Sequence, residues 1–274
     1  MKDMIGINKR PSIELARMRL LSLCALVLVL QACVTTTTGG FTVEVSEEEA
    51  LEDYIQLAKG YFDAGDMVSA RRHVNNALEI DARNSETHNV LALIYQREGD
   101  LDLADDYFRR AISLDRDNSR ARNNYAAFLF SEQRYSEAFE QLERVTADAS
   151  YEGRAIAFEN LGRAALRLER YEQAENAFTR ALQLNSNLYF SSLELAALRV
   201  RAENWQAARQ SFAQYRTTAQ FYNIPYTPRA LLLGIQIEGR FNNRELVEEF
   251  ALILATLHQN SPEFQAYQRL SNAN

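Results

Sequence analysis

A spacing of about 34 residues between similar triplets constrains the fold of this chain more than any other feature. In each triplet a small or aliphatic residue is followed four positions later by a bulky residue, and seven positions later by another apolar one. The triplets begin at Ala70, Ala104, Ala138, Ala174, Ala208 and Leu246. A repeat of this length indicates a unit that buries its apolar face only against its neighbours.

A second column of small residues stands twelve positions before each triplet, next to a bulky apolar residue. These small residues are Ala58, Ala92, Ala126, Gly162, Ala196 and Gly234. Small residues let two paired helices approach closely, while bulky residues at helical spacing fill the groove between units. The pattern is typical of the tetratricopeptide repeat. It predicts an all-α, right-handed superhelical solenoid of about six helix pairs over residues 47–270.

Short polar turns are predicted between the two helices of each unit. Gly65 and Gly99 suit the left-handed conformation that ends a helix, and the aspartate after each suits the N-cap of the next helix. Pro225 and Pro228 interrupt the rhythm after the fifth unit, because proline disfavours helix there. The last pair is therefore expected either to pack at a changed angle or to act as a capping unit.

Residues 1–32 predict a lipoprotein signal peptide. An apolar run over residues 20–30 follows basic residues and is shorter than the roughly 20 residues that cross a membrane. The segment Leu30-Gln31-Ala32-Cys33 resembles the bacterial lipobox, in which the cysteine is acylated and becomes the first mature residue. The alternative is a chance cysteine at the end of the signal. Either Met1 or Met18 fits as the start of the chain.

Lipidation of Cys33 would anchor the protein to a membrane, because two acyl chains already give stable binding. The residue after it is Val34 and not aspartate, which in bacterial lipoproteins implies the outer membrane, with the folded part facing the periplasm. Residues 33–46 are small and polar, which predicts a flexible tether. Cys24 would be removed with the signal, so neither a disulfide nor a cysteine metal site is expected.

The charge balance argues against nucleic acid as a partner. The whole chain has 30 basic and 37 acidic residues, and residues 1–32 contain five and two of these, which leaves 25 and 35 in the mature chain. An acidic protein of this kind is a poor candidate for binding a polyanion.

The sequence contains no catalytic constellation, so we expect neither an enzyme nor a small-molecule substrate. It has no phosphate-binding glycine loop and no nucleophile elbow. His73, His88 and His258 lie far apart in the repeat register, so no metal site is expected, and no cofactor is expected beyond the lipid on Cys33. An enzyme stays open only if carboxylates pair in a deep groove.

Repeat solenoids usually bind partners along the concave face made by the first helix of each pair. The register places ten candidate groove residues there: Ile55, Lys59, Phe62, Asn89, Leu93, Gln96, Asn123, Asn124, Phe130 and Asn160. Asn124 and Asn160 share one repeat position and are candidates for clamping a bound backbone. The alternative for Phe62 and Leu93 is that they only complete the packing between repeats.

The order of these features resembles a known family. A short lipoprotein signal, an anchor cysteine, six repeats, the closing segment 232–238 and the ending 250–265 are similar to the type IV pilus biogenesis and stability proteins PilW and PilF. The resemblance implies a pilotin, a lipoprotein that binds the pilus secretin and promotes its localisation to the outer membrane and its assembly into multimers. We place the binding on the first units, which are nearest the anchor. The alternative is another periplasmic repeat lipoprotein, an adaptor for peptidoglycan hydrolases or for outer-membrane protein assembly.

Overall fold

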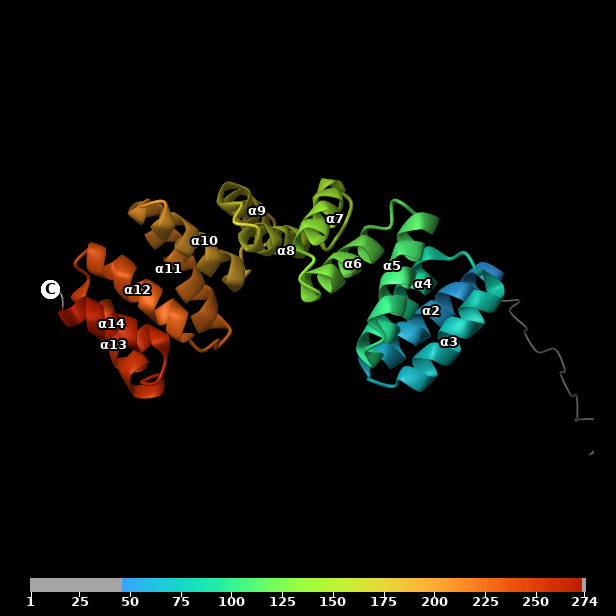
Figure 1. Ribbon diagram of the computed structural model, residues 1–274, viewed down its shortest axis with the longest axis horizontal. Coiled ribbons are helices and arrows are strands. Elements are labelled where there is room, and N and C mark those ends of the chain that lie inside the picture. Colours follow the sequence, from blue (N-terminus) through green and yellow to red (C-terminus); the bar gives the residue numbers. More distant parts are fainter. Residues whose placement is uncertain (1–45, 273–274) are drawn as a thin grey trace, which may run out of the picture. The chain divides into compact units, whose positions relative to one another are not determined.

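The computed structural model describes residues 46–272, and this part of the chain forms thirteen helices and no strand (Figure 1). The helices are α2 (Glu47–Asp63), α3 (Met67–Ile80), α4 (Ser85–Glu98), α5 (Leu101–Leu114), α6 (Ser119–Ser131), α7 (Tyr135–Ala147), α8 (Arg154–Arg167), α9 (Tyr171–Leu184), α10 (Tyr189–Arg201), α11 (Trp205–Phe221), α12 (Pro228–Arg240), α13 (Arg244–Leu257) and α14 (Pro262–Asn272). The predicted signal peptide, Cys33 and the tether up to residue 45 lie outside the described residues.

Consecutive helices pack as pairs, from α2 with α3 to α12 with α13. We call the first helix of each pair helix A and the second helix B. Each helix B also contacts helix A of the following pair, and helices A of neighbouring pairs touch, as α2 does α4 and α6 does α8. The pairs follow one another in chain order (Figure 1). The predicted all-α superhelical repeat fold is therefore confirmed.

The turns inside the pairs follow the expected chemistry. Gly65 and Gly99 have φ values of +82° and +85°, and the side chains of Asp66 and Asp100 accept hydrogen bonds from backbone N–H groups in the first turn of the next helix. The later units place non-glycine residues in the same left-handed conformation at the same point of the repeat. These residues are Gln133, Glu169, Glu203 and Asn242.

The two residue columns of the repeat form the core. The triplets are fully buried in the first five units, as in Ala104, Phe108 and Ala111, each 0% exposed. The sixth unit departs from the predicted register, since Phe250 and Leu254 are buried while Leu246 and Ile253 are only partly so. The left-handed residue of this unit, Asn242, follows the small residue Gly234 by eight positions and not by seven as in the earlier units, so helix B begins one residue later in the repeat.

The end of the chain adds a helix that the count of six pairs did not include. Pro228 begins α12, the position where proline costs no hydrogen bond, and Thr227 caps it through the backbone N–H of Ala230. Helix α14 then packs against α12 and α13, and it contributes Phe264 and Tyr267 to the last core cluster. The last pair thus carries an additional terminal helix, and the described fold ends with α14 and not with the sixth pair.

Candidate protein-binding surface

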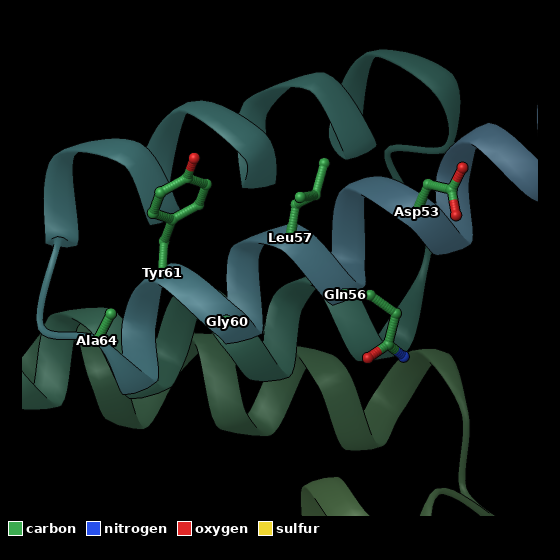
Figure 2. A pocket seen from close by; sticks show the side chains of 6 residues that line it. All are labelled: Asp53, Gln56, Leu57, Gly60, Tyr61 and Ala64. Carbon is green, nitrogen blue, oxygen red and sulfur yellow. The ribbon is translucent and has the colours of Figure 1, made fainter.

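One face of α2, the first of the described helices, is an open groove. The side chains of Asp53, Gln56, Leu57, Gly60, Tyr61 and Ala64 line a hollow of about 640 Å³, which we call the α2 groove. These residues recur every three or four positions, so they lie along one side of the helix. Figure 2 shows the side chains of Leu57 and Tyr61 projecting from the same side of α2. The groove extends from Asp53 to Ala64, the residue after the end of α2, and eleven steps of helical rise make it about 16 Å long.

The exposure of Leu57 follows from its place at the beginning of the described solenoid. Leu57 is 45% exposed, whereas the residues at the same repeat position in the other units are between 3% and 9% exposed. Those residues are Leu91, Tyr125, Leu161, Leu195 and Leu233. In the later units this face of helix A packs against helix B of the preceding pair. Within residues 46–272 no helix B precedes α2, so its face has the character of a packing surface but lies open.

Gly60 is the second unusual feature of the α2 groove. A glycine inside a helix lowers its stability by about 1 kcal/mol relative to alanine. A Cβ atom built on Gly60 would meet no atom within 4 Å, so the packing of residues 46–272 does not require a glycine there. A close approach of another backbone is a common reason for such a glycine.

The sequence did not single out the α2 groove, although the repeat register contains the signal for it. Leu57 belongs to a column of core residues and therefore looks buried. Its exposure becomes visible only when its unit is recognised as the first of the described repeats, because no preceding described unit then covers it.

Several of the predicted groove residues are engaged in packing between repeats. Ile55 and Asn89 are 2% and 1% exposed, so in this structure their side chains offer almost no surface to a partner. Asn124 donates from Nδ2 to Oδ1 of Asn89 at 3.1 Å. The guanidinium of Arg97 lies over the ring of Phe62, 4.0 Å from its centroid.

Lys59 takes part in an ion-pair network that joins the first three repeats. Its Nζ lies 2.6 Å from Oε1 of Glu86, and Nη1 of Arg120 lies 3.4 Å from the same oxygen. Nδ2 of Asn118 donates to Oε2 of Glu86. Burial alone would raise the pKa of the Glu86 carboxyl, but the hydrogen bond and the charge of Lys59, with Asn118 and Arg120, hold that pKa below its usual value.

The other predicted groove residues lie on α4, α6 and α8. Leu93 packs at the edge of a core cluster, Gln96 is half-buried, and Oδ1 of Asn123 is buried without a hydrogen-bond partner. Phe130 and Asn160 come together in a second hollow of about 200 Å³. We call it the α6–α8 hollow; its lining is Ala126, Ala127, Phe130, Ser131, Leu142, Asn160 and Arg163.

Two of the three histidines pack against aromatic rings in the described part of the chain. The ring of His73 stacks on Tyr61 with centroids 5.3 Å apart, and that of His88 stacks on Tyr107 at 5.7 Å. Burial lowers the pKa of His88, whose Nε2 lies 3.0 Å from the carbonyl oxygen of Ala82. Within residues 46–272 no group of three or more His, Cys, Asp or Glu side chains is placed to hold a metal ion.

Comparisons with known proteins agree with the repeat and with the resemblance seen in the sequence. Family models described as tetratricopeptide repeat match residues 85–118, 117–187 and 159–223. The type IV pilus assembly protein PilF of Pseudomonas aeruginosa is 33% identical over 240 residues, which cover 87% of this chain and 93% of that protein.

Two solved structures extend the likeness to the fold. The structure of Pseudomonas aeruginosa PilF matches with a TM-score of 0.74 and 34% identity, and the match covers 81% of this chain and 98% of PilF. The structure of PilW, described as a widely conserved type IV pilus biogenesis factor, matches with a TM-score of 0.63 and 26% identity over 80% of this chain and 99% of PilW. The chain therefore belongs to the PilF and PilW family of tetratricopeptide-repeat proteins of type IV pilus biogenesis.

Proposed function

We propose that this protein is an outer-membrane lipoprotein scaffold of the pilotin kind, without catalytic activity, that binds the type IV pilus secretin. In this proposal it brings the secretin to the outer membrane and promotes its assembly into multimers. The observation that carries the binding is the α2 groove, an apolar packing face that no described repeat covers. The family supports a role in pilus biogenesis, since PilF is named for type IV pilus assembly.

The α2 groove favours a helix as the bound segment. In the five later units the equivalent face of helix A receives helix B of the preceding pair. A partner helix with apolar residues on one side would occupy the groove in the same manner, with its side chains around Leu57 and Tyr61. Gly60 would let the two backbones approach closely, as small residues do inside the repeats.

The membrane part of the proposal rests on the sequence around Cys33. Acylation at this cysteine would hold the protein on a membrane, and Val34 favours the outer membrane. No helix within residues 46–272 is long and apolar enough to span a membrane. The proposal therefore places the membrane contact at the lipid and leaves the repeats facing the periplasm.

The experiment compares two leucines of similar exposure in the full chain. Leu57→Gln changes the α2 groove, and Leu184→Gln changes α9, where the leucine is 47% exposed. Each tagged variant is purified from detergent-solubilised membranes, its co-purified proteins are identified by mass spectrometry, and secretin multimers are measured on native gels. We expect Leu57→Gln to lose the secretin and the multimers, and Leu184→Gln to keep both.

Two results would change the proposal. If Leu57→Gln retains the secretin at the wild-type level, the α2 groove is not the binding surface. If the wild-type chain captures peptidoglycan hydrolases or outer-membrane assembly factors and no secretin, the protein is an adaptor for another envelope process.

A further inference from the structure

Arg163 on α8 is held between two aromatic rings that come from neighbouring repeats. Its guanidinium carbon lies 5.3 Å from the ring centroid of Phe130 on α6 and 5.1 Å from that of Phe190 on α10. Aromatic rings attract a guanidinium at this range and fix its position. The side chain is nevertheless exposed, and it lines the α6–α8 hollow.

The charge of Arg163 is not neutralised by the repeats around it. Some cations on other helices A have carboxylate partners, as Lys59 has Glu86 at 2.6 Å and Arg199 has Glu175 at 3.1 Å. Within residues 46–272 no carboxylate lies within ion-pair distance of Arg163, and its N–H groups make no hydrogen bond there. A guanidinium has five such donors, so the site offers a fixed positive charge with free donors.

The hollow beside Arg163 is apolar and has the size of a side chain. The ring of Phe130 and the buried Leu142 line it, and its volume of about 200 Å³ lies below the roughly 300–1,000 Å³ of small-molecule sites. The amide of Asn160 also lines it, and within the described residues this amide makes no hydrogen bond. An amide can both donate to and accept from a peptide backbone.

We propose that the α6–α8 hollow is a second binding subsite, which takes an acidic peptide segment of a partner protein. A large apolar side chain of the segment would fill the hollow against Phe130 and Leu142. A carboxylate next to it would bind the guanidinium of Arg163, and Asn160 would hydrogen-bond the peptide backbone. The positive charge of Arg163 favours a carboxylate as the ligand, because the two oxygens of a carboxylate match the paired N–H donors of a guanidinium. The subsite is separate from the α2 groove and does not depend on a secretin as the partner.

The test selects peptides without assuming a partner. A random 12-residue peptide library is displayed on phage and selected on the full chain in detergent, and the enriched sequence is synthesised with a fluorescent label. We expect the enriched peptides to carry Asp or Glu beside a large apolar residue. Their affinity, measured by fluorescence anisotropy, should fall about tenfold or more with Arg163→Gln, and equally when the acidic residue is replaced by its amide.

Controls separate this subsite from other sources of binding. Arg167→Gln is the matched control, because Arg167 lies one turn along α8 over the ring of Tyr135, outside the hollow. It should leave the affinity unchanged, as should Leu57→Gln in the α2 groove. The proposal is overturned if no acidic and apolar peptides are enriched, if Arg163→Gln binds them as well as wild type, or if inorganic phosphate alone displaces them.

Discussion

A Cβ atom added to Gly162 would lie 2.6 Å from Cε1 of Phe178, which is closer than Cβ atoms approach other heavy atoms in proteins. Gly162 belongs to helix A and Phe178 to helix B of the same pair, α8 and α9. The small residue is therefore needed for the ring to lie directly on the backbone. Gly234 and Phe212 make a similar contact between α12 and α11.

Replacing Gly162 with alanine should destabilise the protein although alanine is the better helix former. The added methyl would push the buried ring of Phe178, and overpacking of a core typically lowers the free energy of unfolding by about 1–3 kcal/mol. Over most of this range the cost is larger than the gain of roughly 1 kcal/mol in helix propensity. Urea unfolding followed by circular dichroism checks the change. An unchanged or raised midpoint would show that α8 and α9 separate at no cost.

Removing the ring of Phe108 should destabilise the second and third repeats. Phe108 is fully buried, and its ring lies 5.6 Å from that of Tyr125 and 5.5 Å from that of Phe128, centroid to centroid. Phe108→Ala should lower the free energy of unfolding by about 3–5 kcal/mol. Thermal melts measure the loss, and hydrogen exchange should place it in α4–α7. Leu252→Ala, at a site 68% exposed, is the control and should change stability by less than about 0.5 kcal/mol.

The repeat columns made most of the fold predictable from the sequence. Ala58, Ala70 and Ala77 could be assigned to the core because small residues at helical spacing mark the contact between paired helices, and all three are fully buried. The turn chemistry was equally local, since a glycine followed by an aspartate ends one helix and caps the next. Local spacing and local hydrogen bonds can be predicted from the sequence because they do not depend on contacts between distant residues.

The candidate sites depend on contacts between repeats, which the register alone does not specify. Asn124 looked free to hold a partner, but it bonds Asn89 one repeat earlier. The rings that hold Arg163 come from α6 and α10, and their meeting depends on how each pair rotates against the next. Gly60 differs from these residues, because no contact in the described chain explains why a glycine stands at this position.

The ion pairs of Glu86 should make the stability of the first repeats depend on pH. The pKa of this carboxyl is lower in the folded chain than its usual value. The unfolded state therefore binds more protons than the folded state once the pH approaches the unfolded pKa of about 4.3. The stabilisation is complete above that pH and is lost as the pH falls through the lower folded pKa.

Glu86→Gln isolates this effect. At neutral pH we expect it to cost about 1.5–3 kcal/mol, because the hydrogen bonds to a charged group are lost. The difference between the wild-type chain and the variant should shrink as the pH falls from 5 toward about 3. Urea midpoints over this range measure it, with Glu140→Gln on an exposed face of α7 as the control. A difference that is constant with pH would mean that Glu86 acts through packing and not through its charge.

Gly60→Ala should raise stability and lower partner binding in the same molecule. The methyl would meet no atom of the described chain, so the helix gains about 0.5–1 kcal/mol in the free energy of unfolding from the smaller entropy of the unfolded state. The same methyl would stand in the α2 groove and keep a partner backbone at a distance. Urea unfolding measures the first effect, and co-purification of the secretin from detergent-solubilised membranes measures the second.

The opposite signs of these two effects make the result specific. A variant that lost binding through misfolding would also lose stability, so a more stable chain that binds less must be changed at the contact itself. Ala64→Ser, at the end of the same face, is a mild control and should keep most of the binding. If Gly60→Ala binds the secretin as tightly as wild type, close backbone approach at α2 is excluded and the glycine needs another explanation.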